Sequence, residues 1–167
     1  DSGAGGLMPN IMPEAERNLL LSALLKIDLE KMGATVLMTR YDNTTVTAEG
    51  RCSALRNTAP DLCISIHHDS ASNQSNNGCG VFCFNALSHN ATVNVFNRTR
   101  ASGIYKTTYK KWHYFYLARI STCPVVLIEN GFISSPIDFT GISDYNTNVL
   151  KAKATAQGVA DYFRSIQ

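Results

Sequence analysis

The sequence predicts a single α/β domain with a mostly parallel, twisted sheet and helices on both faces. Segments with a helical hydrophobic period alternate along the chain with short apolar segments, an order typical of α/β folds. The chain has 167 residues, 44% of them hydrophobic, which suits one ordinary domain with a substantial core. No internal repeat or low-complexity linker divides the sequence, so we expect one domain.

Charge and cysteine content exclude several classes of protein. Lys and Arg number 15 and Asp and Glu 13, a formal net charge of +2 that gives no indication of a nucleic-acid or membrane-surface partner. No apolar run reaches the length of about 18 residues that a membrane span requires. The five cysteines, odd in number and irregularly spaced, are expected to be buried small side chains rather than a disulfide framework.

Three segments are predicted to be helical. Apolar residues recur at helical spacing over residues 14–32, and Gly33 follows as a C-terminal cap. A short helix is predicted from a Thr47 cap to about Asn57. Residues 150–166 carry an amphipathic pattern and predict a terminal helix.

Short apolar segments predict the strands of the sheet. The segment "DLCISI" (61–66) is apolar almost throughout, as expected of a strand that is covered on both faces. The other predicted strands are residues 34–40, 79–84, 114–118 and 123–129.

Two of the predicted strands end in residues that can carry chemistry. His67 and His68 directly follow "DLCISI", and Glu129 ends the segment "CPVVLIE". In open α/β sheets, ligands bind beyond the carboxyl ends of the strands. A neutral imidazole is a common metal ligand, and a carboxylate at a neighbouring strand end could join it or act as a base. Taken alone, "IHHD" fits a pair of surface histidines equally well.

The order of several motifs narrows these alternatives. The sequence resembles the zinc-dependent N-acetylmuramoyl-L-alanine amidases of bacterial cell-wall turnover (the amidase_3 family), and the resemblance extends from residue 1 to the terminal helix. It implies a zinc hydrolase, secreted or wall-associated and of bacterial or phage origin. It would cleave the amide between N-acetylmuramic acid and L-alanine of the peptidoglycan stem peptide. The segments that carry it are E-x-x-x-N-L (14–19), V-L-M-T-R-x-D (36–42), Arg51, D-L-C-I-S-I-H-H (61–68) and V-V-L-I-E-N-G-F-I-S-S-P-x-D (125–138).

The resemblance also implies roles for single residues. Glu14 and His67 match two zinc ligands of the family, and Glu129 matches its catalytic glutamate. Together with a further histidine, such a ligand set leaves one position open for water, as in catalytic zinc sites. Glu129 would take the proton of that water and pass it to the departing amine. His68 is expected to support the site or to lie on the surface, and Asp69 stands where many members carry Asn.

The first zinc ligand of the family has no obvious counterpart. The chain opens with "DSGAGGLMPNIMPE". In one alignment Ala4 replaces the histidine; in the other the histidine lies upstream of Asp1, which fits the distance to Glu14 better. Both alignments omit the first strand of the family. We therefore expect residues 1–167 to be an N-terminally incomplete amidase catalytic domain.

A second class of function remains open from the sequence. If the first histidine is absent, the protein could be an inactive relative that binds peptidoglycan or regulates a partner. For the enzyme, the expected partner is the muramyl-peptide substrate, with an activator or regulatory protein also possible. Zinc content distinguishes the two classes.

Overall fold

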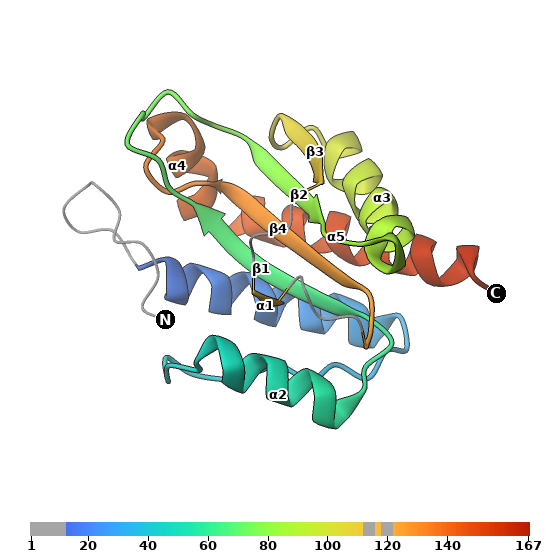
Figure 1. The fold of residues 1–167 in the computed structure, drawn as a ribbon. Coiled ribbons are helices and arrows are strands. Elements are labelled where there is room, and N and C mark those ends of the chain that lie inside the picture. Colours follow the sequence, from blue (N-terminus) through green and yellow to red (C-terminus); the bar gives the residue numbers. More distant parts are fainter. Residues whose placement is uncertain (1–12, 112–115, 118–121) are drawn as a thin grey trace.

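The computed structural model describes residues 13–111, 116–117 and 122–167. They form an α/β fold with five helices and four strands (Figure 1). In chain order the elements are α1 (Glu14–Lys31), α2 (Ala48–Thr58), β1 (Cys63–Asp69), β2 (Cys79–Cys83), α3 (Ala86–Ala101), β3 (Thr107–Lys111), β4 (Val125–Phe132), α4 (Pro136–Ser143) and α5 (Tyr145–Ser165).

The four strands form one mixed sheet in the order β1-β4-β2-β3. The pairs β1–β4 and β2–β3 are parallel, whereas β2 runs antiparallel to β4. The start of β2 therefore lies at the same edge of the sheet as the end of β4. Among the described helices, none has the length and apolar character needed to cross a bilayer.

Helices cover both faces of the sheet, as the apolar strands predict. Along β4 the side chains alternate, and Val126 and Ile128 pack into a core that also contains residues of α1, α3 and α5. Val125 faces the other way and packs with Leu55 of α2. Alternate residues of β4 are thus buried against different helices, so the strand reads as a continuous apolar run.

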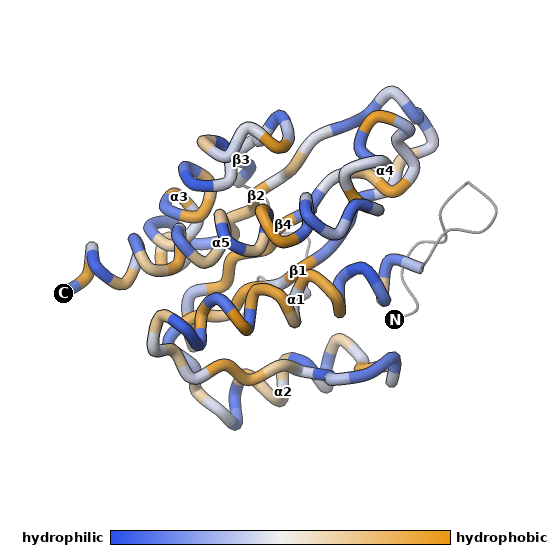
Figure 2. Tube along the Cα trace, turned by 180° about the vertical axis from the view of Figure 1, so that it is seen from behind, coloured by the Kyte–Doolittle hydropathy of each residue, from blue (hydrophilic) through white to orange (hydrophobic). Residues whose placement is uncertain are grey.

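Helix α1 changes character along its length, and this places polar groups at one edge of the sheet. Leu21, Leu25 and Leu29 recur every four residues and are buried in the core. The first turns are instead hydrophilic, a change that is visible in Figure 2. Figure 1 shows this polar end of α1 on the side where β1 and β4 end. At the other end Gly33 caps the helix as predicted, and Ala34 N–H donates to Leu29 O at 3.1 Å.

Helix α3 is a helix that the sequence analysis did not predict. The Asn85 side chain caps it by accepting a hydrogen bond from Ser88 N–H at 3.0 Å. Its buried face contains Thr92 and Thr99 beside the apolar residues Ala91 and Val95. Both threonine hydroxyls donate to carbonyls one turn earlier in the helix. Because these buried residues are polar by type, the helical apolar pattern is weak.

The predicted strand over residues 34–40 is wrong. This segment has no strand conformation. Some of its backbone groups form hydrogen bonds with side chains instead of with a neighbouring strand. Lys26 Nζ donates to Val36 O at 3.0 Å, and the Tyr41 hydroxyl accepts from Met38 N–H at 3.3 Å. Leu37, which the strand would have buried, is 67% exposed.

The other predicted boundaries are close to those observed. Thr47 caps α2 by accepting from Gly50 N–H at 3.0 Å, as predicted. Strand β4 begins and ends later than predicted, and α5 begins earlier because Asp144 caps it. The strand predicted over residues 114–118 lies mostly outside the described residues. All five cysteines are free, and four of them are buried.

Close packing of α3 on α5 makes Gly158 a position where we expect the fold to be sensitive to an added side chain. A Cβ atom at this position would lie 2.5 Å from Val95 Cα and 3.0 Å from Asn94 O. In an open helix, Gly→Ala stabilises by about 1 kcal/mol. Here the added methyl meets backbone, so Gly158→Ala should destabilise by about 1–3 kcal/mol in urea unfolding. Lys153→Ala, an exposed change on the same helix, should have little effect. A stabilised Gly158→Ala would contradict this packing.

Candidate functional site

Two neighbouring strands bring His67 and Glu129 together. Strands β1 and β4 are parallel, and these two residues are partners in their register. Register partners in a parallel pair point to the same face of the sheet. On the other side of β4, Glu129 lies opposite Gly80 of β2, which has no side chain. The Glu129 carboxyl group therefore has an imidazole on one side and a glycine on the other.

The start of α1 places Glu14 against His67. Glu14 Oε1 lies 3.1 Å from His67 Nδ1. The Glu14 residue is buried, whereas the His67 side chain is 26% exposed. Two ligands of a tetrahedral zinc ion, each about 2.0–2.2 Å from the metal, lie about 3.3–3.6 Å apart. The 3.1 Å separation of these two atoms is close to that range, so the pair is a candidate for holding a shared metal ion.

Glu129 is a buried carboxyl group whose pKa lies near neutrality. The residue is 7% exposed, and burial raises its pKa to about 7. That pKa already includes the opposing effect of His67, which lowers it, and the smaller effect of the Asp69 charge, which raises it. Within the described part of the chain, Glu129 Oε2 has no hydrogen-bond partner. A carboxyl group in this state can accept and release a proton at neutral pH.

The described residues supply two of the expected zinc ligands. Within residues 13–111, 116–117 and 122–167, no group of three or more His, Cys, Asp or Glu side chains could hold a metal. Ala4, the position where one alignment places the missing histidine, lies outside the described residues. Glu14, His67 and the third ligand thus all stay predictions.

His68 is a buried residue that faces α1, so it is not a surface histidine. It is 3% exposed, and its Nδ1 lies 2.7 Å from Asn18 Oδ1. Burial, together with the charge of Lys151, lowers the pKa of His68 to about 3. The ring is therefore neutral at pH 7. Through its contact with Asn18, it packs against the end of α1 that carries Glu14.

Asp138 fixes the ends of two strands at this edge. Its Oδ2 accepts hydrogen bonds from Phe132 N–H at 2.9 Å and from Gly78 N–H at 2.7 Å. Near the end of β4, Gly131 has a φ of 102°, a backbone conformation that favours glycine. The sequence motif that ends in Asp138 contained this residue, but a single chain gave no signal that its partners were backbone amides of two separate segments.

A buried lysine of α5 contacts the backbone of β4 at Asn130, the residue after Glu129. Lys151 Nζ donates to Asn130 O at 3.3 Å and lies 4.5 Å from the centre of the Tyr105 ring. Asn130 in turn donates through Nδ2 to His67 O at 3.2 Å. Sequence reasoning missed this group because a lysine in an amphipathic helix normally lies on the exposed side.

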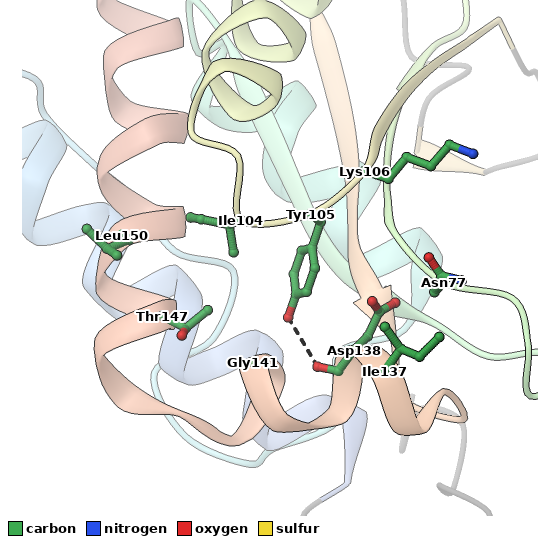
Figure 3. A pocket seen from close by; sticks show the side chains of 9 residues that line it. All are labelled: Asn77, Ile104, Tyr105, Lys106, Ile137, Asp138, Gly141, Thr147 and Leu150. Atoms are coloured by element: carbon green, nitrogen blue, oxygen red, sulfur yellow. Dashed lines mark hydrogen bonds between the residues drawn. The ribbon is translucent and has the colours of Figure 1, made fainter.

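A surface hollow of about 410 Å³ opens between α4, the start of α5 and the segment before β3 (Figure 3). Figure 3 shows the Tyr105 hydroxyl pointing to Asp138 O, to which it donates at 3.2 Å. The Asp138 carboxylate that lines the hollow already accepts two backbone hydrogen bonds. The hollow thus has no paired acid and imidazole, and the end of β1 and β4 is the better candidate for chemistry.

The fold and this site define a class of protein. It is an α/β protein in which an acid and an imidazole meet beside a buried carboxyl group, at the carboxyl ends of parallel strands. Residues 1–161 match the family described as N-acetylmuramoyl-L-alanine amidase, and the chain belongs to that family.

Similar proteins agree with this assignment. The chain is 30% identical over 164 residues to the probable cell wall amidase LytH of Staphylococcus aureus, with 98% of this chain covered. It spans about half (54%) of the length of that relative.

Two solved structures have the same fold. The catalytic domain of CwlV, an N-acetylmuramoyl-L-alanine amidase from Bacillus (Paenibacillus) polymyxa, superposes with a TM-score of 0.92 at 22% identity, covering 98% of this chain and 92% of that one. The CwlD amidase of Clostridioides difficile, solved in complex with the GerS lipoprotein, gives a TM-score of 0.85 at 21% identity, covering 100% and 93%.

The buried amine of Lys151 should make the stability of the fold depend on pH. Burial lowers its pKa from the ordinary 10.5 to about 8. Between these values the unfolded chain binds more protons than the folded chain, so the free energy of unfolding rises with pH in this window. From about pH 7 to pH 10, the unmodified chain should gain up to about 3 kcal/mol relative to Lys151→Met in urea unfolding.

The control for this experiment is Lys153→Met, because Lys153 is exposed on the same helix. Its unfolding free energy should follow that of the unmodified chain across the pH range. Parallel curves for the unmodified chain and Lys151→Met would show that the amine is not perturbed.

Proposed function

We propose that this chain is a zinc-dependent amidase catalytic domain. It would hydrolyse the amide between the lactyl group of N-acetylmuramic acid and L-alanine of the stem peptide. The observation that carries the proposal is the Glu14–His67 pair, 3.1 Å apart, beside the buried Glu129 in a chain of the amidase family. The fold places all three at the edge where α/β proteins bind ligands.

In this proposal Glu14 and His67 hold the zinc ion, and a third ligand comes from outside the described residues. One carboxylate and one imidazole belong to the ligand types that catalytic zinc sites use. A bound zinc ion supplies Lewis-acid chemistry, since it polarises a carbonyl group and makes water more acidic. Glu14 is buried and accepts hydrogen bonds that fix its carboxylate, so this ligand is held in place before any ion binds.

Glu129 serves as the general base and then as the acid. Its pKa of about 7 lets it accept a proton from the attacking water at neutral pH. The water oxygen bonds to the amide carbon, and the carbon–nitrogen bond then breaks. The same carboxyl group gives the proton to the departing amine of L-alanine. Because Glu129 Oε2 has no hydrogen-bond partner among the described residues, it is available for this transfer.

The setting of the reaction follows from the substrate. Peptidoglycan lies outside the cytoplasmic membrane, so we propose a secreted or wall-associated protein. The CwlD amidase was solved in complex with a lipoprotein. A regulatory partner is therefore part of the proposal for this chain too.

Digestion of purified peptidoglycan tests the bond that is cleaved. We expect new L-alanine amino termini, detected by labelling amino groups before and after digestion. Removal of zinc by a chelator should abolish their release, and added zinc should restore it. New reducing sugar ends would instead identify a glycosidase. Wall binding without zinc or cleavage would identify an inactive relative.

Two substitutions separate the proposed base from the proposed ligand. Glu129→Gln keeps the shape of the side chain but cannot accept a proton, so turnover should fall by about 10²–10⁴-fold while zinc content is kept. His67→Ala should lose the zinc itself, because a site with one ligand fewer binds the ion poorly. Zinc content by elemental analysis and turnover on peptidoglycan are measured for both variants.

Glu30→Gln is the matched control, because Glu30 is an exposed glutamate on α1. It should change neither zinc content nor turnover. Full activity of Glu129→Gln would remove Glu129 from the mechanism. Equal loss of zinc from both site variants would make Glu129 a ligand instead of a base.

A further inference from the structure

Among the described residues, three groups lie within hydrogen-bond distance of Oε1 of the Glu14 carboxylate. Asn18, one helical turn further along α1, donates through Nδ2 at 3.0 Å. The backbone N–H of His68 donates to the same oxygen at 3.3 Å. His67 Nδ1 is the third neighbour, at 3.1 Å. The direction in which this oxygen points is thus set by residues of both α1 and β1.

The orientation of the Asn18 amide is fixed from both ends. Its nitrogen faces the carboxylate of Glu14, which only accepts hydrogen bonds when ionised. Its oxygen must then face the His68 ring, whose Nδ1 lies 2.7 Å away. If the amide were reversed, two oxygens would face each other at the Glu14 end. The hydrogen-bond pattern allows one arrangement only.

This arrangement determines where the His68 ring carries its proton. Because Asn18 Oδ1 is an acceptor, Nδ1 of the ring must be the donor. The other ring nitrogen, Nε2, is then a bare acceptor, and it has no hydrogen-bond partner within the described residues. The ring is 3% exposed, so this acceptor is buried with no partner in the part of the chain that the structure describes. Such a group is costly, which indicates that the Nδ1 contact has a function beyond packing.

We propose that His68 and Asn18 are positioning residues that hold the Glu14 carboxylate toward His67. The Nδ1–H of His68 orients the Asn18 amide, and that amide orients the carboxylate. What Glu14 then binds rests on the proposed function, whereas the orientation itself does not. Hydrogen bonds to the ligands of a metal site typically contribute 10–100-fold to metal affinity.

Two amide substitutions of His68 separate this role from simple packing. The side chain in His68→Asn can place an amide nitrogen where Nδ1 lies, whereas His68→Gln carries its amide one bond further, near the position of Nε2. We expect zinc affinity within about threefold of the unmodified chain for His68→Asn, and a loss of about 10–100-fold for His68→Gln. Affinity is measured by competition with a chelator, and thermal unfolding of the zinc-free forms verifies that both variants fold.

A double substitution tests whether the two residues act as one unit. Asn18→Leu removes the donor to Glu14, so it should lose about as much zinc affinity as His68→Gln. If the His68 effect passes through Asn18, the double variant Asn18→Leu/His68→Gln should be no weaker than Asn18→Leu alone. Additive losses would show that His68 acts without Asn18 and would overturn the proposal. Equal affinities of His68→Asn and His68→Gln would also overturn it.

The tautomer of His68 gives a readout that needs no metal. Long-range ¹H–¹⁵N spectra of the zinc-free protein should show His68 with its proton on Nδ1, and Asn18→Leu should change this state. A proton on Nε2 in the unmodified chain would overturn the proposal. If the chain binds no zinc at all, the proposed function fails, while the tautomer still decides whether His68 and Asn18 form this pair.

Discussion

The contact between the polar end of α1 and the end of β1 is the constraint on which the rest of the site depends. Glu14 accepts from a backbone amide of β1 and meets the side chain of His67 in the same place. The leucines further along α1 pack the helix against the sheet and so fix its position relative to β1. The apolar core therefore fixes the helix, and the helix fixes the carboxylate. Hydrogen bonds complete the last step, where packing alone would leave the side chain free to turn.

Residues at strand ends could be predicted from the sequence because a simple rule applies to them. A parallel pair brings His67 and Glu129 to one edge whatever the surrounding helices do, and both residues follow clear apolar runs. Glu14 could be assigned only through the family resemblance, since nothing local distinguishes it from a glutamate that favours a helix start. Its 3.1 Å distance from His67 depends on how α1 packs, and no periodicity contains that information.

The misjudged parts of the fold have a common physical cause. Helix α3 buries threonines whose hydroxyls donate hydrogen bonds to the helix backbone, so polar residue types occupy core positions. Lys151 lies on the buried face of α5 although lysine is a charged residue type, and it contacts a backbone carbonyl and an aromatic ring. Residues 34–40 show the reverse case, a β-like pattern whose backbone groups bond to the side chains of Lys26 and Tyr41. In all three, hydrogen bonds of polar side chains decide the outcome, and a hydrophobic pattern does not contain that information.

The antiparallel strand β2 has a consequence for how proteins of this shape can diverge. Because β2 enters the sheet from the edge where β1 and β4 end, residues 70–78 and 102–106 approach that edge along with the segment after β4. These connections lie outside the sheet, and loops of this kind tolerate insertion and deletion. Evolution could therefore lengthen or shorten these connections without disturbing the strands beside them. Such a plan separates the variable edge, where the candidate site lies, from the sheet that keeps the fold.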